Sequence, residues 1–235
     1  MASAHPADSA IFGHLWTTPE ASALFSDEGR TQAWLHILAA LAQAQADCGL
    51  VPPAAAGAIR AHADVSLLDL DLVARQTRET GHSTMGLIRA LREVLPEHAR
   101  EWIYYGATVQ DLSDTWFALV FRAVGDLAER DVTRMRDRAL ELADEYRDTP
   151  MCGRTHGQPG LPVTFGFKAA VWAAELDRHL ERLRQGRRRW EVAQLGGALG
   201  TMEFWGQAAL GLLAGFAGQL GLGVPVIPWI TARDG

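Results

Sequence analysis

Apolar residues recur at helical spacing along most of the chain. After a polar start at Ser26, an apolar stripe runs from Trp34 to Cys48 and stops at Gly49. Leucine, isoleucine and alanine fill this stripe every third or fourth position, which is typical of one buried helix face. The pattern therefore predicts a helix here, and further short helices are expected to begin at Pro53, to run from Leu68 to Thr80, and to extend from Met85 to Leu95.

The pattern changes after Gly106, where much longer segments keep one apolar face. From Val109 to Arg147 there is no proline and only one glycine. This predicts a single helix well beyond the common length of about 10–14 residues. A helix of that length needs long partners, and the segments Val163–Ala193 and Met202–Leu222 are expected to supply them.

Period-two alternation is too short everywhere to predict a sheet. The predicted fold is therefore all-α, with an N-terminal helical domain over residues 1–105 followed by the first part of a long-helix bundle over 106–235. Residues 149–162 are dense in proline, glycine and hydrogen-bonding groups, and a rigid polar loop is expected there. The apolar segment Phe204–Leu222 contains glutamines and leads into prolines, so it is interpreted as a buried helix that faces other helices of an assembly rather than as a membrane span.

The amino-acid composition and net charge exclude several classes of protein. The 235 residues carry a net charge of −6, with 48% hydrophobic and 21% charged residues, which excludes disorder as the main state. The acidic balance argues against nucleic-acid and anionic-membrane partners, because both need a basic surface. The two cysteines form no disulfide framework, no residue set has metal-ligand spacing, and no secretory signal is visible, so a cytoplasmic protein without a metal is expected.

The first candidate site is the start of the long helix. Thr108 precedes Asp111 by three residues, which is the spacing of a capping box. The same arrangement offers backbone N–H groups and a hydroxyl at a helix N-terminus, which suits a substrate carboxylate. Capping and carboxylate binding both remain open at this position.

Two histidines and a glycine-rich bend are further candidates. His156, between small residues on the proline-stiffened loop, is suited to general acid or base chemistry, or else serves a neighbouring carbonyl. His82 follows a helix end at Gly81, where a C-terminal cap is the alternative interpretation. Residues 194–201 lack the features of a nucleotide-binding loop and favour a bend that lines a cavity.

Taken together, three segments resemble the fumarase/aspartase superfamily, and within it the branch of 3-carboxy-cis,cis-muconate cycloisomerase and adenylosuccinate lyase. The likeness extends from about Phe25 to Arg233 and Asp234. The segments that carry it are Gly-Ala-Thr-Val-Gln-Asp-Leu-Ser-Asp-Thr at 106–115, Gly-Arg-Thr-His-Gly-Gln-Pro-Gly-Leu-Pro-Val-Thr-Phe-Gly at 153–166, and Gln-Leu-Gly-Gly-Ala-Leu-Gly-Thr at 194–201.

This resemblance implies an all-α homotetramer with active sites assembled from three subunits. It implies cofactor-free anti elimination, or its reverse, on a small dicarboxylate or tricarboxylate such as a substituted succinate. It also assigns roles to single residues. Thr108 would hold a substrate carboxylate with support from Gln110 and Asp111, Thr155 and His156 would hold substrate and help with proton transfer, Gln158 and Thr201 would bind substrate, and His82 would face the leaving group.

Departures from the family pattern leave the substrate open. Val109 stands where serine is common, and Ile230 stands where the muconate enzymes usually have histidine. Ser83 after His82, and Leu15-Trp16 near the N-terminus, differ from the adenylosuccinate lyase pattern and favour a substrate without a nucleotide. A muconate cycloisomerase-like activity is therefore preferred, with adenylosuccinate lyase or another fumarate-releasing C–N lyase as the alternative.

The resemblance also implies that the family's catalytic serine loop lies beyond Gly235, so that the chain is about half of a lyase subunit. A non-catalytic helical assembly fragment is the competing hypothesis from another class.

Overall fold

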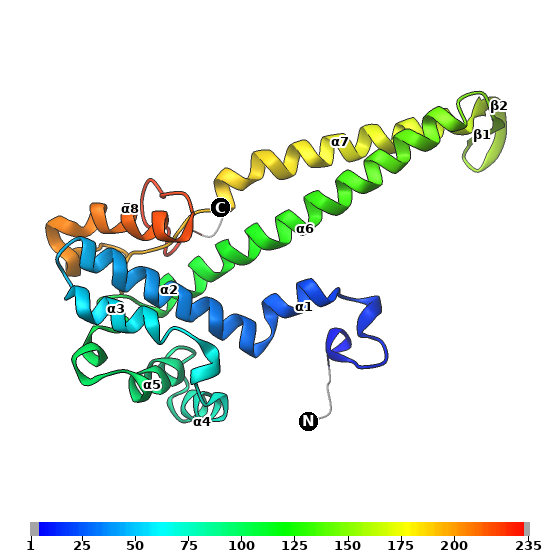
Figure 1. Cartoon of the computed structure of the whole chain (residues 1–235). Coiled ribbons are helices and arrows are strands. Elements are labelled where there is room, and N and C mark those ends of the chain that lie inside the picture. The colour runs from blue at the N-terminus through cyan, green and yellow to red at the C-terminus, as the bar shows by residue number, and fades with distance from the viewer. Residues whose placement is uncertain (1–4, 233–235) are drawn as a thin grey trace. The chain divides into compact units, whose positions relative to one another are not determined.

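A computed structural model of the chain describes residues 5–232, and Arg233 and Asp234 of the resemblance lie outside them. Helices dominate the described residues, as the all-α prediction requires (Figure 1). The α-helices are α1 (Pro19–Phe25), α2 (Asp27–Asp47), α3 (Pro53–Ala61), α4 (Leu70–Thr80), α5 (Met85–Val94), α6 (Val109–Glu145), α7 (Phe165–Trp190) and α8 (Ala209–Leu220). The strands are β1 (Pro150–Thr155) and β2 (Gln158–Thr164), and the 3-10 helices are η1 (Pro6–Asp8), η2 (Gly13–Leu15), η3 (Val65–Leu67), η4 (Glu97–Trp102) and η5 (Glu203–Ala208).

The helix ends follow local signals that the sequence carries. The Ser26 hydroxyl accepts a hydrogen bond of 3.0 Å from the backbone N–H of Gly29 and so caps the start of α2. Gly81 has a φ of 63° and ends α4 in the left-handed conformation that glycine adopts without strain. The long helix α6 has 37 residues, which confirms the prediction of a continuous helix after Gly106.

The described residues fall into two compact units. The first unit comprises residues up to Val120 together with those from Glu191, and the second comprises Phe121–Trp190. Helix α6 contributes residues to both. The division predicted at residue 105 concerns the domains of the whole protein and stays a prediction.

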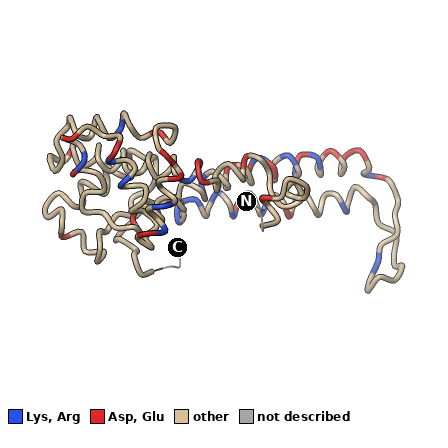
Figure 2. The backbone as a smooth tube through the Cα atoms, turned by 90° about the horizontal axis from the view of Figure 1, so that it is seen from below, with Lys and Arg blue, Asp and Glu red and all other residues tan. Residues whose placement is uncertain are grey.

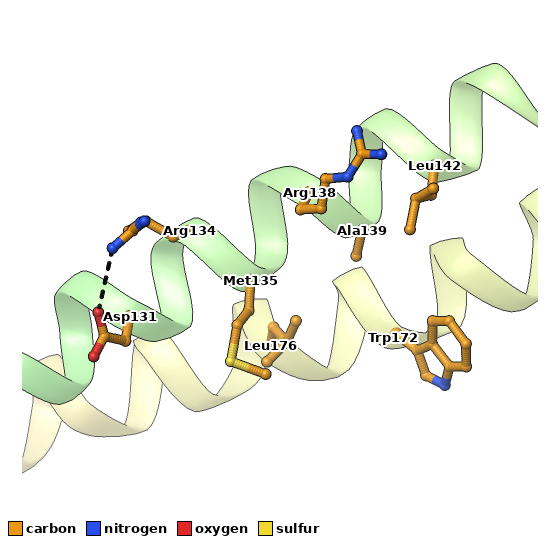
Figure 3. A pocket seen from close by; sticks show the side chains of 8 residues that line it. All are labelled: Asp131, Arg134, Met135, Arg138, Ala139, Leu142, Trp172 and Leu176. Carbon is orange, nitrogen blue, oxygen red and sulfur yellow. Dashed lines mark ion pairs between the residues drawn. The ribbon is translucent and has the colours of Figure 1, made fainter. Parts of the chain in front are cut away.

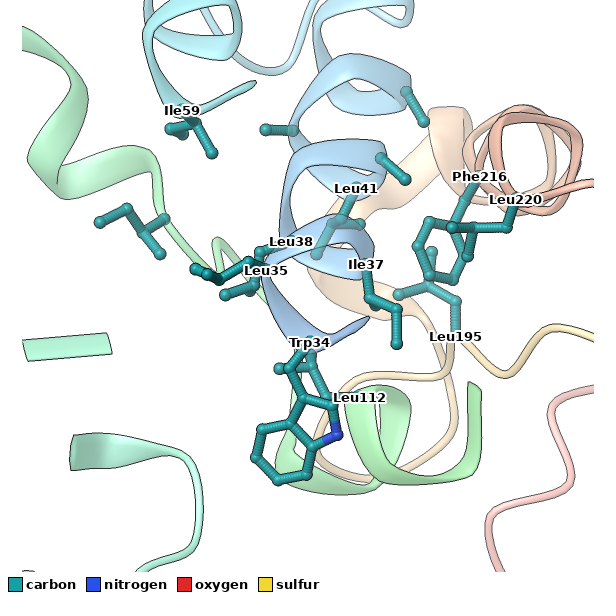
Figure 4. Packing of buried hydrophobic residues seen from close by; sticks show 14 of the residues in the cluster. Trp34, Leu35, Ile37, Leu38, Leu41, Ile59, Leu112, Leu195, Phe216 and Leu220 are labelled. Atoms are coloured by element: carbon teal, nitrogen blue, oxygen red, sulfur yellow. The ribbon is translucent and has the colours of Figure 1, made fainter. Parts of the chain in front are cut away.

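The core of the first unit forms around α2. Leu35, Ile37, Leu38 and Leu41 are at most 2% exposed, so this helix is buried on more than one face. Figure 4 shows Ile37 pointing toward the side chains that α8 brings to the cluster. The α8 members of the cluster are Leu212, Leu213, Phe216, Ala217 and Leu220.

The expectation that residues 202–222 form one helix facing other chains was wrong in two respects. Gly206, with φ 51° and ψ −129°, breaks the helical geometry inside η5, and the α-helix α8 begins only at Ala209. The apolar face of α8 also packs on α2 of the same chain, where the position of a Cβ added to Gly215 would lie 3.6 Å from Ala44. Over residues 5–232, no helix is both long and apolar enough to cross a bilayer.

The second unit is a pair of long helices that ends in a hairpin. Figure 1 shows α7 running back beside α6 from β1 and β2. Ion pairs cross between the helices, from Arg136 to Asp177 at 3.2 Å and from Arg184 to Glu129 at 2.8 Å. Figure 2 shows charges of both signs along these two helices. Arg136 and Glu129 keep only 26% of their side-chain area exposed, whereas Asp177 and Arg184 are more than half exposed.

The hairpin corrects the prediction that residues 149–162 form a loop without strands. β1 and β2 are antiparallel, with Met151 opposite Val163 and Thr155 opposite Gln158. Most of β2 is exposed on both faces. A ribbon without a core beneath it needs no apolar face, so period-two alternation is absent and the sequence gives no strand signal.

Candidate active site

The centre of the site in the first unit is the buried carboxylate of Asp111, which is 1% exposed. One oxygen accepts a hydrogen bond of 2.7 Å from the backbone N–H of Gly196. The other accepts bonds of 3.0 Å from Gly197 and 2.9 Å from Thr108. Asp111 therefore joins the N-terminus of α6 to the glycine-rich bend, which are two of the three segments singled out in the sequence.

The environment of Asp111 has two opposite effects on the pKa of its carboxyl group. Burial raises the pKa of this carboxyl, and the hydrogen bonds from backbone N–H groups lower it without cancelling the effect of burial. The bond to Thr108 is the carboxylate half of a capping box. Since Asp111 is buried and both of its oxygens are bonded to the backbone, it acts on its neighbours.

The glycine-rich bend is held by further bonds to α6. The Thr115 hydroxyl donates to the carbonyl of Gln194 at 2.9 Å and accepts from its N–H at 3.0 Å. The Gln194 side chain accepts from the N–H of Trp229, and the Gln110 amide donates to the carbonyl of Ile230. The amide predicted to support a carboxylate site thus also anchors the segment at 229–230.

The predicted residues Thr108 and Thr201 lie on these two segments in different settings. Thr108 is half-buried at the start of α6, whereas Thr201 is exposed on the bend. The backbone on either side of Thr201 is fixed, because Met202 donates from its N–H to the carbonyl of Gly196 at 3.0 Å. The N-terminus of α6 and this bend offer hydroxyls and backbone dipoles of the kind that bind an anion.

Two residues that sequence reasoning missed connect His82 to this region. Thr84 is fully buried, and its hydroxyl lies 3.0 Å from Nδ1 of His82. Tyr104 lies near Thr84, Thr108 and Asp111, since the side chains of all three influence its pKa. Its φ of 61° is rare for a bulky residue, and no local sequence signal announces it.

The pKa of Tyr104 is raised to about 12, mainly by burial. The nearby Asp111 carboxylate also raises this pKa, whereas the side chains of Thr84 and Thr108 lower it. The folded pKa thus exceeds the ordinary value of 10.0. The unfolded chain loses this proton first, so the contribution to stability is complete below the ordinary value and is lost as pH rises through about 12.

We expect a titration of phenolate absorbance to show this late ionisation directly. Replacing Tyr104 with phenylalanine should remove a transition centred near 12. The matched variant Tyr146→Phe, in the second unit, should leave that transition in place. A Tyr104 transition at the ordinary tyrosine value would contradict the described environment.

The second unit carries the remaining predicted residues on its hairpin. Thr155, His156 and Gln158 are all exposed. His156 and Gly157 form the two-residue turn, with φ values of 47° and 74°, so both take the left-handed conformation of a type I′ turn. A histidine in this conformation is uncommon, and such outliers gather at functional positions.

The site residues therefore fall into two groups, one on each unit. His82, Thr108, Gln110 and Asp111 are brought together by the first unit, with Thr201 on the bend that Asp111 holds. Within the described part of the chain, no group of three or more histidine, cysteine, aspartate or glutamate residues is placed to hold a metal ion.

Comparison with known proteins shows which family the chain is similar to. A family model described as lyase matches residues 15–217. The chain is 38% identical to adenylosuccinate lyase of Methanocaldococcus jannaschii, over 93% of this chain and 46% of the relative. It is also 38% identical to N-acetyl-S-(2-succino)cysteine lyase of Dickeya dadantii, over 98% of this chain and 50% of the relative.

A solved structure extends the comparison to three dimensions. The 3-carboxy-cis,cis-muconate lactonizing enzyme of Pseudomonas putida matches with a TM-score of 0.91 and 38% identity, over 96% of this chain and 52% of that chain. The chain thus spans about half the length of the relatives it matches. By its matching segments and its fold, this chain belongs to the lyase family of the fumarase/aspartase superfamily.

Proposed function

We propose that the whole protein is a cofactor-free lyase or cycloisomerase that acts on a substituted succinate or a carboxymuconate by anti addition–elimination. The proposed activity is most similar to that of 3-carboxy-cis,cis-muconate cycloisomerase. The observation that carries the proposal is the fixed helix N-terminus at Thr108, which Asp111 joins to the glycine-rich bend. We expect this protein to work in the cytoplasm.

The chemistry fits a site of this kind. Removing a proton next to a carboxylate builds negative charge on that carboxylate in the transition state. A helix N-terminus and hydroxyl groups that are already oriented stabilise such charge without reorganising. Thr108 would hold the carboxylate, while Asp111 would keep the helix start and the bend in register.

The other predicted residues would complete the site. Thr155 and Gln158 would bind substrate, and His156 would transfer a proton from the turn of the hairpin. Thr201 would bind from the bend, Gln110 would support the carboxylate site, and His82 would face the leaving group. The whole site would be shared among subunits of a homotetramer.

A groove in the second unit supports the proposed assembly. It has a volume of about 590 Å³ and lies on the surface of α6 and α7 (Figure 3). Met135 is 58% exposed and Trp172 is 42% exposed, which is unusual for side chains of this size. The groove is lined by Asp131, Arg134, Met135, Arg138, Ala139, Leu142, Trp172 and Leu176. Helices of other subunits are the expected cover, since long helices bury their apolar faces against one another.

The test is turnover by the full-length protein with three substrate classes: 3-carboxymuconate, adenylosuccinate and N-acetyl-S-(2-succino)cysteine. Each reaction changes ultraviolet absorbance as a conjugated acid forms or is consumed. We expect 3-carboxymuconate to give the highest kcat/KM. Preference for either other compound would replace the preferred substrate and keep the reaction class. Failure with all three would favour a non-catalytic assembly protein.

His156→Ala should lower kcat/KM by about a hundredfold, because positioned acid–base groups contribute roughly this much or more. The matched control is His36→Ala, which removes an exposed histidine from α2 away from every candidate residue. If His156→Ala behaved like His36→Ala, the proton-transfer role of His156 would be wrong.

A further inference from the structure

Arg30 lies over the rings of two buried tryptophans in the first unit. Its guanidinium carbon is 4.7 Å from the ring centroid of Trp34 and 4.7 Å from that of Trp116. Both tryptophans are almost completely buried, whereas Arg30 is exposed. Trp34 belongs to α2, like Arg30, and Trp116 belongs to α6, so two helices together hold this cation.

The positive charge of Arg30 has no counter-charge in its surroundings. Within residues 5–232, its side chain makes no hydrogen bond and no ion pair. Asp27 and Glu28 stand in the first turn of the same helix, and neither of them pairs with the guanidinium. An aromatic ring neutralises no charge and offers no oxygen acceptor, so the N–H donors of Arg30 lack the carboxylate partner that they bind most strongly.

The two tryptophans add donors to this cluster and no acceptor. The indole N–H groups of Trp34 and Trp116 are buried and have no hydrogen-bond partner in the described part of the chain. Buried polar groups of this kind are normally paired, so a cluster of unpaired donors around an unpaired cation is unusual. An acceptor is the component that the cluster lacks, and the exposed guanidinium is the donor that a ligand reaches first.

An apolar pocket of about 170 Å³ adjoins the cluster. Its walls include Leu24 of α1, Gly29 and Ala33 of α2, and Trp116 and Val120 of α6. Gly29 is the neighbour of Arg30 in the chain, and Trp116 also makes the cation–π contact. An apolar cavity of about 150 Å³ is large enough to hold benzene. The pocket therefore has room for one aromatic ring beside an unpaired cation.

We propose that Arg30 and this pocket form a binding site for a small aromatic monocarboxylate of the size of benzoate. The ring would fill the apolar pocket, and the carboxylate would accept hydrogen bonds from the guanidinium. A neutral aromatic molecule would leave the cation unpaired, and a small anion without a ring would leave the pocket empty. The walls of the pocket include no candidate active-site residue, so this is a second site and the inference does not rest on the proposed function.

Isothermal titration calorimetry of the full-length protein with three compounds tests the two parts of the site. Benzoate carries both the ring and the charge, benzamide carries the ring alone, and acetate carries the charge alone. We expect benzoate to bind at least about tenfold more tightly than either of the others, because each of them lacks one of the two interactions. Absence of benzoate binding at millimolar concentration, or equal affinities for benzoate and benzamide, would overturn the proposal.

Substitutions of Arg30 test its part directly. Arg30→Gln should weaken benzoate binding about tenfold and leave benzamide binding unchanged, because only benzoate uses the charge. Arg30→Lys should lie between the wild type and Arg30→Gln, since an ammonium keeps the charge and loses the planar fork. The matched control is Arg60→Gln, which changes an exposed arginine of α3 that donates to Gln43. Unchanged benzoate affinity in Arg30→Gln would refute the site.

Two further variants locate the bound benzoate. Bound next to Trp116, it should change the tryptophan fluorescence of the protein, and most of this change should disappear in Trp116→Phe. Thr108→Val alters the candidate active site and should leave benzoate affinity as it is in the wild type. Loss of binding in Thr108→Val and not in Arg30→Gln would place benzoate in the candidate active site and contradict the inference. Turnover plays no part in these measurements, so failure of the proposed function and failure of this inference are distinguishable.

Discussion

Replacing Asp111 with alanine should lower the free energy of unfolding by about 4 kcal/mol, because each buried donor left without a partner costs roughly 1–3 kcal/mol. Three backbone N–H groups, those of Thr108, Gly196 and Gly197, would lose their acceptor. The raised pKa of Asp111 shows that burying the carboxylate is itself costly. The cost of removing it is still large, since the donors stay buried.

Urea unfolding followed by circular dichroism measures this change. Asp148→Ala removes an exposed carboxylate and should change the free energy of unfolding by less than about 0.5 kcal/mol. Asp111→Asn should lie between the two, since the amide keeps one oxygen acceptor. An Asp111→Ala protein as stable as Asp148→Ala would mean that the glycine-rich bend does not depend on this carboxylate.

Replacing Gly166 with alanine should cost about 3 kcal/mol, which is the upper range for adding one carbon to a well-packed contact. The new Cβ would stand 2.5 Å from the carbonyl oxygen of Ala143 and 2.7 Å from Cα of Arg147. These are backbone atoms of α6 and of the turn that follows it, so a side-chain rotation does not relieve the clash. The start of α7 would have to move away from the end of α6.

Gly211→Ala is the matched control, because Gly211 also lies inside a helix but has no atom within 4 Å of the added carbon. Alanine there should raise the free energy of unfolding by about 0.5–1 kcal/mol, through its higher helix propensity. Thermal unfolding of both variants would therefore show shifts of opposite sign. Two shifts of the same sign would refute the close approach at Gly166.

The helices could be predicted from the sequence wherever a local signal marks their ends. Ser26 before α2 and Gly81 after α4 are such signals, and the structure uses both as predicted. The hairpin at Pro150–Thr164 could not be predicted, because a ribbon exposed on both faces has no apolar alternation. The break at Gly206 was also missed, since an isolated glycine is tolerated inside many helices.

For the candidate site, the sequence indicates the segments but not their connections. Thr108 and Asp111 share a local pattern, so their relation was visible as a capping motif. The bonds from Asp111 to Gly196 and Gly197 depend on tertiary packing and leave no trace in either segment. Tyr104 was missed because a left-handed tyrosine has no sequence signal.

The hydrogen bonds of Asp111 join residues that are far apart in the sequence, and this affects how the protein folds. Asp111 and Gly196 are 85 residues apart, and the hairpin and both long helix segments of the second unit lie between them. Closing so large a loop is entropically costly, and contacts of high sequence separation slow folding. On the ribosome, the amide donors of the bend emerge after α7 has been synthesised. The bonds from Asp111 to the bend are therefore among the last contacts of the first unit to form, and until then the carboxylate is bonded only to the N–H of Thr108 at the start of its own helix.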